Sequence, residues 1–470
     1  VKEANVIGTL RASGYTRKEL LGHYITLPIL VTLAGAIVGN ILGYTAFKSI
    51  FVAAYYGSYS FPSYYTLWNA DAFVLTTVIP VVIMLAINIL IIGYRLKLSP
   101  LKFLRRELSR KQKKKAVRLP GFKFFNRFRL RIIIQNMPNY ITLFIGILFA
   151  NVLLLFGLML GPMLKHYQND ITAKLIANHQ YVLKQPIAVN DDSAEKYCVK
   201  SLATLEGRLK SEDVLVYGIK ADSEYVLANI RELKENEVYI TDGYADKYKI
   251  KKGDTITLKE KYSDGQYTFK VKGMYDYPSS FAIFMSDTAF KKDFDKEEDY
   301  YSGYLSDKEL DIDEKYIATQ ITIDDLTKVS RQLERSMGTT FEMVKIFAVI
   351  LFAVLMFLLT KLIVEKNTTS ISMVKILGYS NREISRLYVT STTVMVVASV
   401  LISIGASVGI MNYLFRIFME EMSGWISCYY APHIFPVMFM LNIIIYAGIS
   451  IIMMQKIKKI PMDEALKNVE

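Results

Sequence analysis

The chain has 470 residues, of which 52% are hydrophobic and 21% charged, and its formal net charge is +13. The high apolar content excludes an intrinsically disordered chain, and the presence of only two cysteines excludes a disulfide-stapled scaffold. Polar and charged side chains concentrate in residues 165–340, whereas much of the remaining chain is strongly apolar. This asymmetry indicates a membrane protein with one sizeable water-exposed domain.

Six stretches are apolar enough to cross a bilayer as helices, which takes about 20 residues each. One such stretch could be a buried core helix of a large protein, but six in one chain favour membrane spans. In chain order the predicted spans are residues 24–47, 71–94, 140–164, 341–364, 387–413 and 434–454.

Charge predicts the orientation of these spans. Residues 95–131 carry 15 Lys or Arg and one acidic residue, Glu107. The positive-inside rule therefore places this segment in the cytoplasm. Residues 165–340, with 26 basic and 32 acidic side chains, then lie outside. We expect both ends of this chain to be cytoplasmic and residues 165–340 to be extracytoplasmic.

Residues 95–139 are predicted to form a basic cytoplasmic linker that ends in an elbow helix. Phenylalanines alternate with Lys and Arg in residues 122–136, directly before a predicted span. Such a helix lies in the membrane interface, with its rings in the acyl boundary and its cations on anionic lipid. Residues 111–115 read as a solvated turn. The alternative, a nucleic-acid patch, is disfavoured, so we expect membrane lipids as partners and no nucleic acid.

The sequence contains an internal repeat in which residues 7–19 resemble residues 371–383. Each copy has a Gly-Tyr pair where a helix would end in a left-handed cap. Each then has a Thr or Ser three residues before a Glu, which is a capping box that starts the next helix. The matching pairs are Ile7 and Ile371, Arg11 and Lys375, Gly14 and Gly378, Tyr15 and Tyr379, Thr16 and Ser380, Glu19 and Glu383, and Tyr24 and Tyr388.

The spans that follow the two corners agree in register. Gly35, Gly39 and Gly43 occupy the positions that Ser399, Ser403 and Ser407 occupy one repeat later. Small residues at every fourth position let helices approach closely in lipid. We interpret both stripes as helix-packing positions rather than as a substrate path. A Lys-x-x-Pro segment, residues 97–100 and 458–461, follows the last span of each half.

The repeat predicts the domain organisation. In the second half, residues 140–164 are the first span, 165–340 the external domain, 341–364 the second span, 365–386 the coupling segment, 387–454 the last two spans and 455–470 the tail. In the first half, residues 1–23 are the coupling segment and 24–94 the last two spans. Because Val1 aligns with Glu365, we expect roughly 250 further residues of a first unit ahead of Val1.

The external segment is predicted to be a small α+β domain. Residues 238–241, 255–258 and 267–271 read as strands, residues 243–248 as a helical turn and residues 252–254 as a turn. The acidic residues 293–299 lack the spacing of a calcium loop and favour a solvated surface. Whether Cys198 and Cys428 form a disulfide stays open.

Catalytic chemistry has no candidate residues. The chain has no P-loop motif for ATP, and its four histidines show no metal-ligand spacing. Inside the spans, Lys345 and Lys361 lie near span ends, Asn88 and Asn151 are polar but uncharged, and no carboxylate or histidine lies at mid-membrane. An ion-coupled transporter would be expected to keep one there, so that class is disfavoured. We expect no catalytic, cofactor or metal site.

The two corners, the Lys-x-x-Pro segments and residues 245–258 resemble the FtsX-like (MacB-type) permease family of ABC systems. The resemblance implies an α-helical polytopic membrane protein of the bacterial plasma membrane, with an inserted extracytoplasmic α+β domain. It implies a separate ABC ATPase, in two copies, that contacts the helix before each Gly-Tyr corner. Carried over, the ATPase-coupling positions are Ile7, Leu10, Arg11, Gly14, Tyr15 and Glu19, with Ile371, Val374, Lys375, Gly378, Tyr379 and Glu383.

The mechanism implied by this resemblance is mechanotransmission, in which the ATPase moves the corners and rigid spans pass the motion to the external domain. The expected function is export or extraction of a lipophilic or peptide substrate. The alternative is a signalling permease that regulates a cell-wall hydrolase or senses antimicrobial peptides through an extracytoplasmic protein or peptide ligand. The two half-units depart from the single four-span unit of MacB or FtsX itself. The first unit expected ahead of Val1 is missing from this sequence, which leaves the substrate open.

Overall fold

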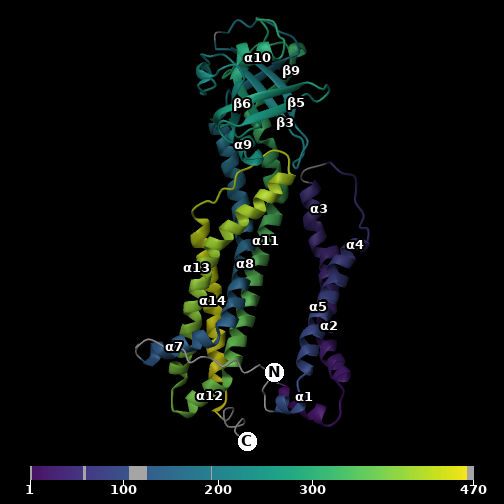
Figure 1. Cartoon of the computed structure of the whole chain (residues 1–470), viewed down its shortest axis with the longest axis vertical. Coiled ribbons are helices and arrows are strands. Elements are labelled where there is room, and N and C mark those ends of the chain that lie inside the picture. The colour runs from purple at the N-terminus through teal and green to yellow at the C-terminus, as the bar shows by residue number, and fades with distance from the viewer. Residues whose placement is uncertain (1–2, 57–59, 105–123, 192, 463–470) are drawn as a thin grey trace. The chain divides into compact units, whose positions relative to one another are not determined.

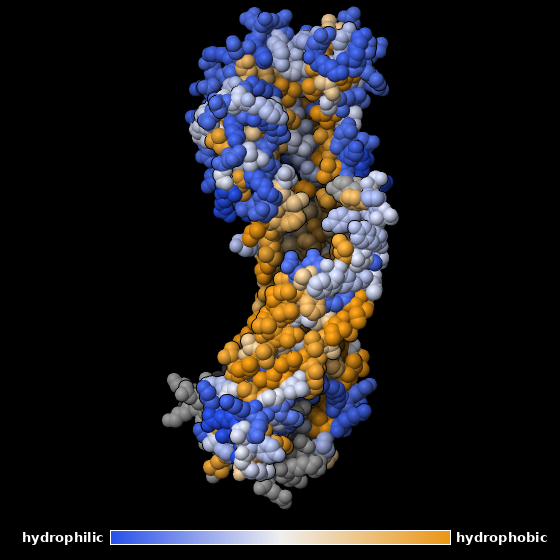
Figure 2. Space-filling view, turned by 90° about the vertical axis from the view of Figure 1, so that its right-hand side faces the viewer, coloured by the Kyte–Doolittle hydropathy of each residue, from blue (hydrophilic) through white to orange (hydrophobic). Residues whose placement is uncertain are grey.

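The computed structural model describes residues 3–56, 60–104, 124–191 and 193–462 (Figure 1). The chain divides into two compact units, Val1–Phe122 and Lys123–Glu470. Six helices of the described residues are long and apolar enough to cross a membrane, and each contains one predicted span. Hydrophobic side chains cover the spans, while the sheet domain is hydrophilic (Figure 2). The predicted fold class, a helical polytopic protein with an inserted α+β domain, is confirmed.

The first unit is a pair of long helices with short helices at one end. Helix α2 packs along α5, and Asn40 of α2 hydrogen-bonds Thr77 of the π-helical turn η2 at 3.0 Å. Helix α1 packs against α6. The elements are α1 (Ala4–Ala12), α2 (Arg17–Leu42), η1 (Gly43–Phe47), α3 (Lys48–Tyr56), α4 (Ala70–Phe73), η2 (Val74–Val78), α5 (Ile79–Leu96) and α6 (Pro100–Leu104).

The second unit contains four long helices, of which α8 packs along both α11 and α13. Helix α7 covers most of the predicted elbow, packs against α13 and lies across the same end of the bundle as α12 (Figure 1). Residues 111–115 and the start of the elbow lie outside the described residues. The helices are α7 (Phe124–Gln135), α8 (Met137–Ala173), α11 (Ile323–Lys366), α12 (Thr368–Ile376), α13 (Asn381–Glu421) and α14 (Ile434–Lys458).

The sheet domain lies between α8 and α11 and contains nine strands. Because β2 pairs with β3 as well as β5, the pairings β3-β7-β4-β6-β5-β2 close into a ring, and β8, β1 and β9 extend it. Alternate apolar residues of the ring strands, such as Val214 and Val216, form the domain core. The strands are β1 (His179–Leu183), β2 (Glu195–Thr204), β3 (Asp213–Ile219), β4 (Glu237–Thr241), β5 (Thr255–Lys259), β6 (Gln266–Tyr275), β7 (Ala282–Ser286), β8 (Gly303–Ser306) and β9 (Ile317–Thr322).

Short helices complete the sheet domain. They are the 3-10 turns η3 (Ile230–Glu232) and η4 (Glu314–Tyr316) and the helices α9 (Asp242–Tyr248) and α10 (Asp287–Asp293). The predicted strands at residues 238–241, 255–258 and 267–271 and the helical turn at 243–248 are confirmed. Cys198 and Cys428 are both free thiols.

The helices that carry the domain are longer than their hydrophobic parts. Helix α8 continues to Ala173 and α11 begins at Ile323, so both enter the segment 165–340 that was predicted as the external domain. A hydropathy window detects only the apolar stretch of such a helix, because the polar extension is amphipathic. The sheet itself occupies residues 179–322 within that segment.

The two small-residue stripes have different surroundings. Ser399, Ser403 and Ser407 are buried in the second unit. Within the first unit a Cβ added to Gly35, Gly39 or Gly43 would meet nothing within 4 Å. The serine stripe thus packs inside its unit, whereas close helix packing at the glycine stripe stays a prediction.

A buried polar network joins three helices of the bundle. Asn151 of α8 donates to Ser403 Oγ of α13 at 2.6 Å, and Asn442 of α14 donates to Asn151 Oδ1 at 2.7 Å. All three residues are almost fully buried. A polar group in a lipid-embedded bundle needs such partners, because no water replaces them.

We expect Asn151→Ala to destabilise the protein by about 1–2 kcal/mol, because Asn442 then lacks its buried acceptor. Asn442→Ala should lower the stability less in a chain that already carries Asn151→Ala than in the parent chain. The contact between the two asparagines is already lost there. The measurement is thermal unfolding of the detergent-purified chain. Asn88→Ala, which removes a bond to the carbonyl of Met84 within its own helix, is the matched control. If the stability losses of the two single variants add up in the double variant, the proposed network is contradicted.

Candidate functional site

The second Gly-Tyr corner joins α12 to α13. Gly378 has φ +88°, a left-handed conformation that strains residues with a Cβ. The Tyr379 N–H donates to Val374 O at 3.4 Å, which closes the end of α12. Ser380 and Glu383 then form a reciprocal capping box at the start of α13. The predicted corner is therefore confirmed in its geometry.

The first corner repeats this geometry between α1 and α2. Gly14 has φ +101°, and the Tyr15 N–H donates to Leu10 O at 3.1 Å. Thr16 and Glu19 form the same reciprocal capping box. The chain therefore builds one turn twice from matching residues.

The matched cations of the two corners perform the same structural task. Lys375 Nζ donates to the carbonyl oxygens of Ile457, Lys458 and Ile460, at 2.6 to 3.1 Å, at the end of α14. Arg11 donates to Leu96 O and Leu98 O, at 2.7 and 2.5 Å, at the end of α5. Each cation thus donates to carbonyl oxygens at the C-terminal end of a helix, where intrahelical partners run out and the dipole is negative. Burial lowers the pKa of Lys375.

The predicted coupling residues divide into an inner and an outer group. Ile371 and Lys375 are buried, and Val374 and Tyr379 pack against the bundle core. Ile7 and Leu10 similarly pack on the small core of the first unit, and Arg11 is half-buried. The exposed members are Gly14, Tyr15, Glu19, Gly378 and Glu383. The inner group packs each short helix against its unit, while the outer group is the more accessible to a partner.

Three exposed apolar side chains on the outer face of the second corner were not singled out in the sequence. They are Met373, Ile376 and Leu377, with exposed fractions of 56%, 48% and 69%. The aligned positions in the first corner are Thr9, Ala12 and Ser13, which are also exposed. The spacing i, i+3, i+4 opposite the buried Ile371 is a helix-face signal that could have identified them.

At the other end of the bundle, α13 is tied to the sheet domain. Lys247 of α9 is fully buried, pairs with Glu212, and donates to Met422 O at 2.6 Å and Gly424 O at 3.2 Å. The Gly424 N–H donates to Glu212 Oε2 at 2.6 Å. We call Glu212, Lys247, Met422 and Gly424 the joint. A buried ion pair with saturated hydrogen bonds fixes geometry, because separating its charges costs several kcal/mol.

Further contacts surround the joint. Arg208 pairs with Glu420 at 3.2 Å, and Arg416 donates to the carbonyl of Asp246 at 3.1 Å. Trp425 packs against both the domain core and the outer part of the bundle core. The segment after α13 therefore contacts both the sheet domain and the helix bundle. These contacts join residues that lie too far apart in sequence for any motif to reveal them.

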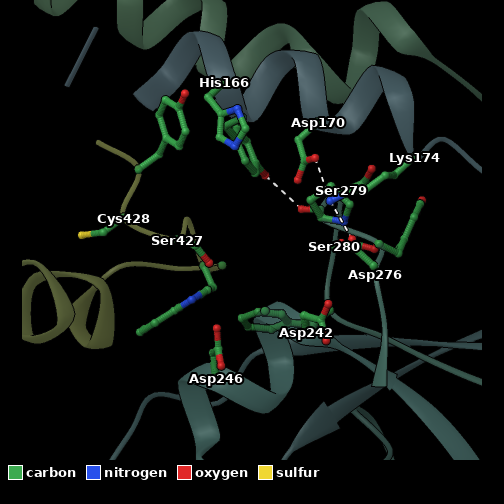
Figure 3. Close-up of a pocket in the computed structure, with 18 of the residues that line it drawn as sticks. His166, Asp170, Lys174, Asp242, Asp246, Asp276, Ser279, Ser280, Ser427 and Cys428 are labelled. Carbon is green, nitrogen blue, oxygen red and sulfur yellow. Dashed lines mark hydrogen bonds and ion pairs between the residues drawn. The ribbon is translucent and has the colours of Figure 1, made fainter. Parts of the chain in front are cut away.

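A cavity of about 410 Å³ lies beside the joint. It is enclosed by α8, α9, the loop between β6 and β7, and residues 424–429 (Figure 3). His166 stacks on Tyr429 with ring centroids 3.8 Å apart, and Trp425 and Phe281 also line the cavity.

The charged lining of the cavity is mostly acidic: Asp170, Asp242, Asp246 and Asp276 against Lys174. Lys174 bridges Asp170 at 2.7 Å and Asp276 at 2.6 Å, as the dashed lines in Figure 3 show. Burial and the neighbouring carboxylates of Asp276 and Asp246 raise the pKa of Asp242, against the effect of Lys174. Negative charge in the cavity is therefore incompletely neutralised.

We expect Lys375→Met to loosen the second corner, because three carbonyls at the end of α14 lose their charged donor. The free energy of local unfolding at this corner should fall by about 2 kcal/mol. Hydrogen–deuterium exchange of residues 368–380 should speed up, and Lys375→Arg should restore part of the protection. Lys459→Met, which removes an exposed neighbouring cation, should change nothing. Equal exchange in both Met variants would contradict the role of Lys375.

Comparison with known families agrees with these corners. Residues 2–100, which contain the first corner and the two spans after it, match the FtsX-like permease C-terminal model. Residues 327–462, which contain the second corner, match a model described as a probable transporter C-terminal domain. No curated protein matches the chain. These two matches make the chain similar to FtsX-like permeases, a family of membrane components of ABC transporters.

Proposed function

We propose that this permease transmits motion between a separate ATPase at its two corners and its sheet domain. The observation that carries the proposal is helix α13. It runs unbroken for 41 residues from the capped corner to the joint, a length of ~60 Å at 1.5 Å per residue. A rigid element held at both ends moves the domain when the corner moves.

The outer face of the second corner supports contact with an ATPase. Met373, Ile376 and Leu377 are exposed on a short helix whose opposite face is anchored by Lys375. Exposed apolar side chains grouped on a helix face are typical of protein-binding surfaces. Because there are two corners, we propose two ATPase copies. The energy would come from the different affinity of the ATPase for two permease states.

We place the corners, and with them both ends of this chain, on the cytoplasmic side of a bacterial plasma membrane. The support is the excess of Lys and Arg in residues 95–131. The sheet domain is then extracytoplasmic. Its position lets it meet a lipophilic or peptide substrate at the outer leaflet, and we propose export or extraction of such a substrate. The cavity beside the joint favours handling of a ligand over a purely signalling role.

Met373→Asp with Leu377→Asp should weaken ATPase binding at the second corner. Each apolar side chain that is buried in the contact contributes about 1.5–3 kcal/mol of binding free energy, which an aspartate does not supply. We expect at least a tenfold loss of ATPase stimulation and of co-purified ATPase. The measurement uses the complex in lipid nanodiscs.

Two control variants accompany this test. Tyr262→Asp changes an exposed aromatic residue of the sheet domain, 97% accessible, and should leave the ATPase unaffected. Tyr15→Asp tests the exposed tyrosine of the first corner, whereas Tyr379 packs on the core and would report stability as well. Normal ATPase coupling in the Met373/Leu377 variant would refute the proposed contact.

Breaking the joint should uncouple the domain from the ATPase. The double variant Glu212→Gln with Lys247→Met removes the pair without leaving a buried charge alone. We expect ATPase binding to persist while ATP-dependent substrate movement in proteoliposomes falls at least tenfold. The control is Asp213→Asn with Lys261→Met, a partly exposed pair in the same domain, which should transport normally. Unimpaired transport in the joint variant would exclude this route of transmission.

A further inference from the structure

The cavity beside the joint combines three properties of a binding site. Its volume of about 410 Å³ lies within the range of small-ligand pockets. Its acidic side chains outnumber its single lysine by four to one. Its aromatic wall, formed by the stacked His166 and Tyr429 together with Trp425, presents ring faces that attract cations.

The carboxylates differ in how far they are neutralised. Asp170 and Asp276 share Lys174, whereas Asp242 and Asp246 form no ion pair with a basic side chain among the described residues. Arg416 approaches Asp246 only at its backbone carbonyl and pairs with Glu420. A cation in the cavity could therefore form ion pairs with the carboxylates of Asp242 and Asp246 of α9.

One residue of the wall also carries a polar atom without a partner. Trp425 Nε1 is buried and has no hydrogen-bond partner among the described residues. A buried donor without an acceptor costs about 1–3 kcal/mol.

We propose that this cavity binds a ligand that carries primary ammonium groups, as the lysine side chains of a peptide do. The ammonium groups contact Asp242 and Asp246, and the aromatic wall covers the methylene chain. Residues 424–429 form both this wall and the connection to the joint through Gly424. Occupation of the cavity therefore acts on the same segment that holds α13 to the sheet domain. The ligand class rests on the proposed function, but its binding does not require the ATPase.

The chain offers a built-in reporter for the test. It has two tryptophans, Trp68 and Trp425, so Trp68→Phe leaves Trp425 as the only tryptophan, whose emission is recorded with excitation that the tyrosines do not absorb. The 470-residue chain in phosphatidylcholine nanodiscs, without ATPase, is titrated with trilysine amide and separately with 1,5-diaminopentane. Neutral 1,5-pentanediol serves as the control compound. Fluorescence and titration calorimetry report binding, and we expect saturation with the amines alone.

Two variants with opposite expected effects locate the site. Asp242→Asn with Asp246→Asn should weaken amine binding about tenfold. Lys174→Met releases Asp170 and Asp276 and should tighten binding by roughly threefold. The charge-matched control, Asp264→Asn with Asp311→Asn at exposed positions, should bind as the parent does. Thermal unfolding checks that each variant is folded.

The outcomes discriminate between explanations. Tighter binding of trilysine amide than of the diamine supports a peptide ligand, and the reverse order supports the ammonium site with a small polyamine as its ligand. Equal response to the diol, absence of both fluorescence change and heat, or unchanged affinity in the Asp242/Asp246 and Lys174 variants would overturn the proposal. Such a failure would leave the ATPase coupling tests unaffected, because no ATPase is present.

Discussion

The hydrogen bonds at the two ends of α13 are the constraint on which the second unit depends. Inside a bilayer a helix satisfies its own backbone, except for the first N–H and last C=O groups. At one end Ser380 and Glu383 close the capping box. At the other end the chain turns at Gly424, which Glu212 and Lys247 hold. A displacement of the corner therefore shifts the helix as a whole, since neither end can fray without breaking charged hydrogen bonds.

The two corners show one physical solution reached with different side chains. Arg11 and Lys375 both donate to carbonyls at the end of the last span of their half, where the helix dipole is negative. The lysine is buried and reaches three carbonyls, while the half-buried arginine reaches two. The inner faces are therefore equivalent. The outer faces are not, because Met373 and Leu377 of one correspond to Thr9 and Ser13 of the other.

The corners could be predicted because their signals are local. A glycine at the left-handed position and a Ser or Thr three residues before Glu determine helix ends within a single turn. The joint could not be predicted, because Glu212 and Lys247 meet a loop about 175–212 residues away. The predicted coupling positions rest on the family resemblance and on the alignment of the two repeats. Alignment does not tell the buried Lys375 from the exposed Met373, whereas helical periodicity does.

The joint and the cavity share one chain segment, and this sharing has a thermodynamic consequence. Gly424 is bonded to Glu212, while the following residues 425–429 include wall residues of the cavity. If the segment has two positions, a ligand that prefers one of them and an ATPase that prefers one state of the corner bias the same equilibrium. Linkage then requires each to change the affinity of the other by the same factor. Under the two proposals, occupancy of the cavity and motion of the sheet domain would act through the same segment.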